Sequence, residues 1–150
     1  MWDDQPTISI ALRARKSREA GCWITYYAEY KLRQELVSYA HLDDNWDGDG
    51  ANAPSQEAVN DALTFLNGRP SDIPLPYPEE GTEGDVGVYW DIRHAHVFAE
   101  VTFEGDGTFA YFAVHGVPGA VAEKCGKDGV DAADPWPDDM LRILRIQDPA

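Results

Sequence analysis

Hydrophobic residues recur every three or four positions in two segments of this chain, residues 24–42 and 56–68. This spacing places them along one side of a helix, so both segments are predicted to be amphipathic helices. Ser55 is a good N-cap for the second helix, and Gly68 is placed to end it. Each helix therefore presents an apolar stripe that another layer has to cover.

The hydrophobic period changes to two in three later segments, residues 86–92, 97–103 and 108–114, which are rich in β-branched and aromatic residues. The short glycine-rich link 104–107 makes the last two strands a hairpin. Residues 94–96 are expected to turn the first strand into the second. The three segments therefore predict an antiparallel β-meander.

Taken together, the helical and strand periodicities of the hydrophobic residues predict an α+β fold. We expect two helices packed on one face of an antiparallel β-meander of three or more strands. The packed face is expected to include Trp90, Val101 and Phe112. In such a fold the helices and the sheet share one hydrophobic core.

The remaining segments show weaker patterns. Four prolines favour an extended crossing without regular structure in residues 69–81. Residues 116–135 are polar and glycine-rich and are expected to form a loop. Pro137 and the two aspartates after it predict a helix start for residues 140–147, with a terminal strand as the alternative because β-branched residues recur there.

Charge is distributed unevenly along the chain. Residues 42–150 carry 22 Asp and Glu and six Lys and Arg, whereas residues 1–41 carry five acidic and six basic residues. The length of 150 residues predicts a single domain, 1–150, with a basic, strand-like or irregular N-terminal arm at about residues 7–21 and an acidic remainder. A field of this sign repels nucleic acid and anionic membranes and attracts cationic surfaces.

Neither a membrane anchor nor a disulfide framework is indicated. No apolar run approaches the roughly 18 residues that a spanning helix needs, and the N-terminus is acidic where a signal peptide is basic, so a cytoplasmic location is expected. Cys22 and Cys125 are far apart in sequence and form no CxxC pair.

The segment LDDNWDGDGANAP, residues 42–54, is dense in Asp, Asn and Gly, and we expect a structured loop that closes through its own side chains. Asp43, Asn45 and Asp47 also match the opening of a calcium-binding loop. The match ends there, because the bidentate Glu that such a loop needs at its twelfth position is replaced by Pro54. We therefore favour the self-closing loop.

His94, His96 and His115 lie at predicted strand ends. They allow a three-histidine metal site or, together with Asp91 or Glu100, acid–base catalysis. Histidines in turns are more often ordinary surface residues, and no nucleophile or phosphate-binding motif accompanies them. We therefore expect no catalytic residue, no metal site and no cofactor.

A basic cluster from Arg13 to Arg18 is followed by Trp23, Tyr26 and Tyr27. Basic residues interleaved with aromatic ones are typical of nucleic-acid-binding patches. Because the field of the whole chain opposes the approach of phosphates, we favour a solvated arm that pairs with the acidic remainder. No direct binding of nucleic acid or membrane is expected.

The segment Asn45-Trp46-Asp47-Gly48-Asp49-Gly50-Ala51 resembles a group of small bacterial and prophage-borne proteins with an NWDGxGA signature. An amphipathic helix, a proline-rich IPxP crossing and a GxVxVxW strand follow in that group, and residues 73–76 and 84–90 fit. The resemblance covers roughly residues 42–116 and carries no catalytic residue. Asp49 stands where the group often has an aromatic residue, which makes this loop more acidic. In size and charge, the chain also resembles anti-CRISPR and other anti-defence inhibitors, in general character only.

A net charge of -15 exceeds what solubility requires of a small domain. The leading hypothesis is therefore an acidic, non-enzymatic inhibitor that binds the basic nucleic-acid-binding surface of a protein. It would act as a DNA mimic, in the manner of an anti-CRISPR protein that blocks DNA binding by a CRISPR effector. The candidate contact residues are carboxylates of the loop, the second helix and the segment after the prolines: Asp43, Asp44, Asp47, Asp49, Glu57, Asp61, Glu79, Glu80, Glu83 and Asp85.

The main alternative is an antitoxin or immunity-type protein that binds through an aromatic surface with Tyr26, Tyr27 and Tyr30. A third hypothesis is a metal-dependent hydrolase that uses the three histidines. The identity of the partner and the oligomeric state do not follow from the sequence.

Overall fold

The computed structural model describes the backbone of residues 20–149 and the side chains of residues 24–149. The chain divides into two compact units, the first ending at Glu35 and the second beginning at Leu36. The predicted basic arm at residues 7–21 lies outside the described residues, except that its last two residues begin a helix. The predicted contact carboxylates all belong to the second unit.

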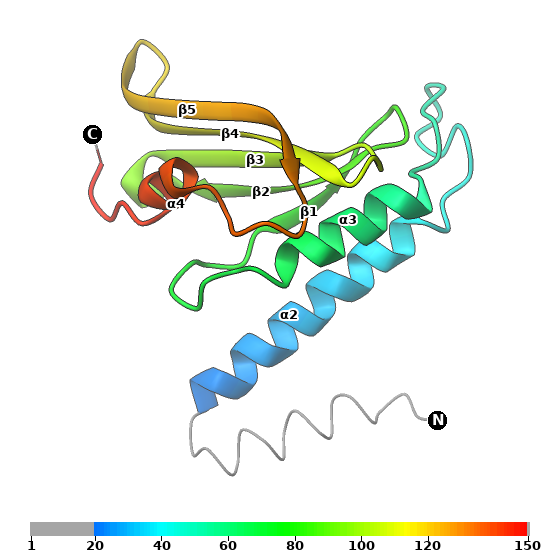
Figure 1. The fold of residues 1–150 in the computed structure, drawn as a ribbon, viewed down its shortest axis with the longest axis horizontal. Helices are drawn as coiled ribbons and strands as arrows, with labels where there is room; N and C mark the ends of the chain where they lie inside the picture. The colour runs from blue at the N-terminus through cyan, green and yellow to red at the C-terminus, as the bar shows by residue number, and fades with distance from the viewer. Residues whose placement is uncertain (1–19, 150) are drawn as a thin grey trace. The chain divides into compact units, whose positions relative to one another are not determined.

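Three helices and a five-stranded sheet make up the described residues. The helices are α2 (Ala20–Tyr39), α3 (Gln56–Leu66) and α4 (Asp138–Leu144). The strands are β1 (Tyr77–Glu80), β2 (Val86–Ile92), β3 (Val97–Phe103), β4 (Thr108–Val117) and β5 (Ala120–Asp131), with a 3-10 turn, η1 (Arg93–Ala95), after β2. Figure 1 shows the strands side by side in sequence order, as an antiparallel meander. The predicted α+β class is confirmed.

α3 and α4 begin where the sequence predicts, whereas α2 begins at Ala20, four residues before the predicted start of the first helix. Ser55 Oγ accepts a hydrogen bond from the Ala58 N–H at 3.0 Å, which satisfies a donor at the start of α3. α4 starts directly after Pro137, so the C-terminal segment forms the predicted helix and not the alternative strand. In the part of the chain that the structure describes, no helix has the length and apolar character needed to cross a bilayer.

One face of the sheet is buried. The antiparallel register places Val101 opposite Val88 and Tyr111, so these three side chains share that face. Trp90 and Val101 are buried, as predicted, but the prediction for Phe112 is wrong, because this side chain is 44% exposed. A neighbour one position along a strand always points to the opposite face, so Tyr111 takes the place expected for Phe112. The opposite face, called the aromatic face below, carries Tyr77, Tyr89, Phe98, Glu100 and Phe112.

Phe65 of α3 lies in the centre of the core, where its side chain is fully buried. Its ring stacks on Trp136 with a centroid distance of 4.2 Å and meets Phe103 and Phe109 edge-on at 5.4 and 4.9 Å. Trp136 Nε1 donates a hydrogen bond to the Phe65 carbonyl at 2.8 Å. These contacts join α3 and the segment before α4 to the buried side of the sheet.

Two strands lie where the sequence predicts irregular structure. β1 lies in the crossing at residues 69–81, where an edge position accommodates Pro78 because one side of an edge strand needs no N–H donor. β5 replaces the loop predicted at residues 116–135. It is also an edge strand and is largely exposed, so it needs no alternation of hydrophobic residues.

Candidate functional site

The loop between α2 and α3 is closed by its own side chains, as the sequence predicts. Asp47 Oδ1 accepts hydrogen bonds from the N–H groups of Asp49 and Ala51, at 2.9 and 3.1 Å. Asn45 Oδ1 accepts one from the Gly50 N–H at 2.7 Å, and the Asn45 N–H donates to the Ala51 carbonyl at 2.6 Å. The two N–H donors hold the pKa of Asp47 below its ordinary value, so this carboxylate stays ionised.

Further bonds fix the two ends of this loop. Trp46 Nε1 donates to the Asn52 carbonyl at 3.1 Å, and Asp44 Oδ1 accepts from the Ala53 N–H at 2.8 Å. Gly48 has a φ of 78°, a conformation that residues with a side chain rarely adopt. The residues of the NWDGxGA pattern therefore have structural roles, and the variable position holds the exposed Asp49 side chain.

The loop lies beside the turn between β1 and β2. The Asn52 N–H donates to the Thr82 carbonyl at 2.8 Å, and the Ser55 N–H donates to the Gly84 carbonyl at 2.9 Å. Asn52 and Glu83 also form an isolated β-bridge. The carboxylates of the loop and of this turn are thus brought to one end of the sheet, on the right in Figure 1.

The turn between β3 and β4 reaches the same end. Its Gly107 N–H donates to Asp61 Oδ2 on α3 at 2.8 Å. Gly105 approaches the start of α3 so closely that a side chain there would come within 3.1 Å of Glu57 Cβ. Between these segments lies a hollow of about 250 Å³ lined by three carboxylates, those of Glu83, Asp85 and Glu104.

We call this end of the sheet the acidic end. It consists of carboxylates from the loop, from α3 and from the two turns: Asp43, Asp44, Asp47, Asp49, Glu57, Asp61, Glu80, Glu83, Asp85, Glu104 and Asp106. All of the predicted contact residues except Glu79 lie there. Glu104 and Asp106 are additions, because only the contact between α3 and the β3–β4 turn reveals their position.

The segments that form the acidic end contain no Lys or Arg: residues 42–68, 79–85 and 104–107. Several cations of the second unit are instead paired around α4 and the end of β2. Arg145 contacts Asp72 at 2.7 Å. Arg93 contacts Asp91 at 3.1 Å. The acidic end therefore keeps its negative charge without internal neutralisation from its own segments.

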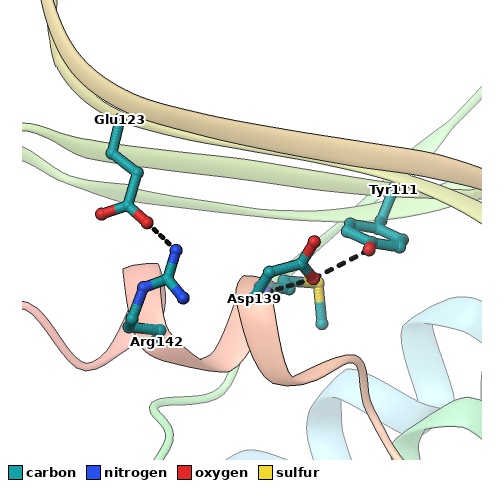
Figure 2. A network of polar contacts seen from close by, with 5 residues as sticks. Tyr111, Glu123, Asp139 and Arg142 are labelled. Atoms are coloured by element: carbon teal, nitrogen blue, oxygen red, sulfur yellow. Dashed lines mark hydrogen bonds and ion pairs between the residues drawn. The ribbon is translucent and has the colours of Figure 1, made fainter.

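α4 is held on the sheet by a polar network (Figure 2). Arg142 forms an ion pair with Glu123 of β5, and the Tyr111 hydroxyl of β4 donates to Asp139 Oδ1 at 2.8 Å. Burial and the Asp139 carboxylate raise the pKa of Tyr111. Burial and the same carboxylate also raise the pKa of the Cys125 thiol, which keeps it protonated and weakly nucleophilic. The network therefore stabilises the fold and does not activate a nucleophile.

The metal interpretations find no support in the geometry. Between residues 24 and 149, no three His, Cys, Asp or Glu side chains come together in a way that could hold a metal ion. The side-chain oxygens of Asn45 and Asp47 accept backbone N–H groups within their loop. His115 Nε2 contacts the Asp148 carbonyl at 3.1 Å, and His94 lines a hollow of about 560 Å³ beside Trp90.

Glu79 lies on the aromatic face. Its side chain passes over Gly87, whose missing side chain leaves room for it, and its carboxyl is hydrogen-bonded to that of Glu100 on β3. Burial, this hydrogen bond and the charge of Glu100 raise the pKa of Glu79 to about 7. Below that pH the Glu79 carboxyl holds a proton.

Replacing Glu79 by glutamine is expected to change the pH dependence of stability. The Glu79 carboxyl ionises near 4.5 in the unfolded chain and near 7 in the folded protein. Between these values only the folded protein holds the proton, so the free energy of unfolding of the native chain falls as the pH rises through this window. Glu79→Gln removes that loss. In urea unfolding, the variant should gain stability over the native chain from about pH 5 to about pH 8.

Glu80→Gln is the matched control for this experiment. It removes the exposed carboxylate of Glu80, which is the next residue of β1 after Glu79. Its difference from the native chain should change much less over the same pH range, because the charge of Glu80 raises the pKa of Glu79 less than burial and Glu100 do. An equal pH dependence in the two variants would contradict the assignment to the Glu79–Glu100 pair.

No protein-family model matches this chain, and searches of curated proteins and of solved structures found no match.

Proposed function

We propose that this protein is a cytoplasmic, non-enzymatic inhibitor whose acidic end binds the basic nucleic-acid-binding surface of another protein and keeps DNA or RNA away from it. The observation that supports the proposal is the gathering of carboxylates from three separate segments at one end of the sheet. A dense negative field attracts the Lys- and Arg-lined grooves that otherwise hold phosphates.

The acidic end is held in one conformation by hydrogen bonds, which favours tight binding. The α2–α3 loop is fixed by hydrogen bonds from Asp44, Asn45 and Asp47, and the β3–β4 turn is fixed by Asp61. Carboxylates on a surface that is ordered before binding lose less conformational entropy when a partner docks. Asp43, Asp49, Glu57 and Glu83 are exposed and remain available for contact.

The first partner class to test is the DNA-binding channel of a CRISPR effector, because such a channel is long and basic and holds nucleic acid during function. The proposal retains the arrangement in which the helices predicted at residues 24–42 and 56–68 pack on one face of the sheet. The acidic end then stays accessible beyond the strand ends.

A second candidate function is that of an antitoxin or immunity-type protein. The observation that favours it is a set of exposed apolar side chains on α2, where Tyr26 and Tyr27 are each 39% exposed and Ile24 is 60% exposed. Aromatic side chains of this kind are common anchors of protein interfaces. In this case the acidic charge would steer the encounter and contribute less to affinity.

Affinity capture at two salt concentrations tests the proposed function. The immobilised full-length chain should retain a basic nucleic-acid-binding protein from bacterial lysate at about 0.1 M salt and release it at about 0.5 M, where exposed charges are strongly screened. Added DNA should compete with the captured protein for binding. Retention that is insensitive to both salt and DNA would contradict the proposal.

A further inference from the structure

The aromatic face carries a continuous row of side chains across four strands. Tyr77 of β1 is paired with Tyr89 of β2, Tyr89 with Glu100 of β3, and Glu100 with Phe112 of β4. The rings of Tyr77 and Tyr89 lie 5.5 Å apart, and Phe98 lies 6.4 Å from Tyr89. Large apolar rings are thus gathered around one central carboxyl.

Two of these rings are open to solvent, since Tyr77 is 61% exposed and Phe112 is 44% exposed. Two glycines lie among these rings: Gly87 of β2 lies opposite Glu79, whose side chain fills the space above it, and Gly126 of β5 lies opposite Phe112. No side chain of the described residues covers Gly126, so an incoming side chain can lie flat against the sheet beside Phe112.

The centre of this row is negatively charged. The carboxyls of Glu79 and Glu100 are hydrogen-bonded to each other, and none of the ion pairs between described residues involves either of them. Two adjacent carboxyls repel each other once both are ionised. A cation placed between them would remove that repulsion.

We infer that the aromatic face is a docking site for an arginine side chain on an extended segment of a partner protein, with the guanidinium bound by Glu79 and Glu100 and stacked on Tyr89 or Tyr77. A planar guanidinium forks onto two carboxylates and stacks on aromatic rings at the same time. The site lies on the aromatic face, next to Glu80 and Asp85 of the acidic end, and the inference does not depend on the proposed function.

Other occupants fit this surface less well. Single-stranded nucleic acid stacks on aromatic sheets, but its phosphates would be repelled by the carboxyl pair. A second copy of this chain would bring two such pairs together at a net charge of -15 for each chain. A lysine carries the same charge as arginine but lacks the planar group that stacks.

Peptide titration of the ¹⁵N-labelled full-length chain tests the inference. The probe is the capped pentapeptide Gly-Val-Arg-Val-Gly, and the matched peptides carry citrulline or lysine in place of arginine. The arginine peptide should shift the amides of β1, β2 and β3 around the Glu79–Glu100 pair. Its affinity should exceed that of the citrulline peptide by about tenfold, because a charge-assisted bidentate contact is lost.

Two double variants, each of which replaces two carboxyl groups by amides, distinguish this site from the acidic end. Glu79→Gln/Glu100→Gln should lower the affinity for the arginine peptide to that of the citrulline peptide. Glu80→Gln/Glu83→Gln, which removes two carboxylates of the acidic end instead, should leave the affinity for the arginine peptide within about twofold of the native value. Tyr77→Leu, at an exposed position that the fold does not need, should weaken binding about threefold through loss of the cation–π contact.

The affinity for arginine should also rise between about pH 6 and about pH 8, because the guanidinium takes the place of the proton on Glu79. The charged groups that face Glu79 are Glu80, Asp85 and Glu100. All three are acidic, so each raises the pKa of Glu79 and strengthens the attraction for a cation.

Several outcomes would overturn the inference. These are equal affinity for the arginine and citrulline peptides, loss of binding in the Glu80/Glu83 variant alone, and shifts of aromatic-face amides by oligothymidylate. Amide shifts that change on dilution without peptide would also overturn it, since they would identify a second copy as the occupant.

Discussion

Reversing Asp43, Asp49 and Glu83 to lysine is expected to weaken binding of the captured nucleic-acid-binding protein by about 100-fold, because each change replaces an attraction with a repulsion at a basic surface. These carboxylates are exposed and cap no backbone group, so the reversal leaves the loop and the turns intact. The dissociation constant can be measured by calorimetry or surface plasmon resonance at constant salt.

A second triple variant, Asp91→Lys/Asp138→Lys/Asp148→Lys, has the same net charge but leaves the acidic end unchanged. It should bind within about threefold of the native chain, because those positions lie outside the proposed contact surface. Equal losses in the two triple variants would show that only total charge matters and would contradict the mimicry proposal. Affinity that survives both reversals but is lost on Tyr26→Ala/Tyr27→Ala would favour the antitoxin-type alternative.

Replacing Phe65 by alanine is expected to lower the free energy of unfolding by about 4 kcal/mol. The change removes the ring that stacks on Trp136 and meets Phe103 and Phe109, and it leaves a cavity at the junction of α3 and the sheet. This loss is comparable to the whole stability of many domains, so the milder Phe65→Leu, with an expected loss of about 1.5 kcal/mol, provides a second measurement. Urea unfolding followed by tryptophan fluorescence reports both values.

Phe112→Ala removes the same ring from the aromatic face and is the matched control. Because that side chain is already 44% exposed, its loss should cost less than about 1 kcal/mol. A cost close to that of Phe65→Ala would mean that the aromatic face is covered within the folded chain, and the proposed arginine site would then be excluded.

The central part of the fold follows from the sequence, and its edges do not. β2, β3 and β4 each bury one face, so hydrophobic alternation marks them clearly. β1 is short and contains Pro78, and β5 is largely exposed, so neither carries that signal. The error at Phe112 has a different cause, because the register of a strand pair depends on the partner strand and cannot be read from one strand alone.

The acidic end could be predicted only in part. The composition of the α2–α3 loop and of α3 identifies most of its carboxylates, but their meeting in space depends on the bonds from Asn52 to Thr82 and from Gly107 to Asp61. Such contacts between distant segments leave no local pattern. The sequence also does not reveal that Glu79 lies apart from the other predicted contact residues. Its position beside Glu100 depends on the alternation of side chains along β1 and on the space above Gly87.

The meander ends in two strands whose outer sides have no neighbour in the sheet. Pro78 removes a main-chain donor from one border, while Lys124, Lys127 and the irregular register of β5 disfavour the addition of a further strand at the other. Extension of the sheet by a foreign peptide backbone is thereby hindered on both sides. The choice of a binding partner must then depend on individual side chains, so single substitutions can change which partner is bound.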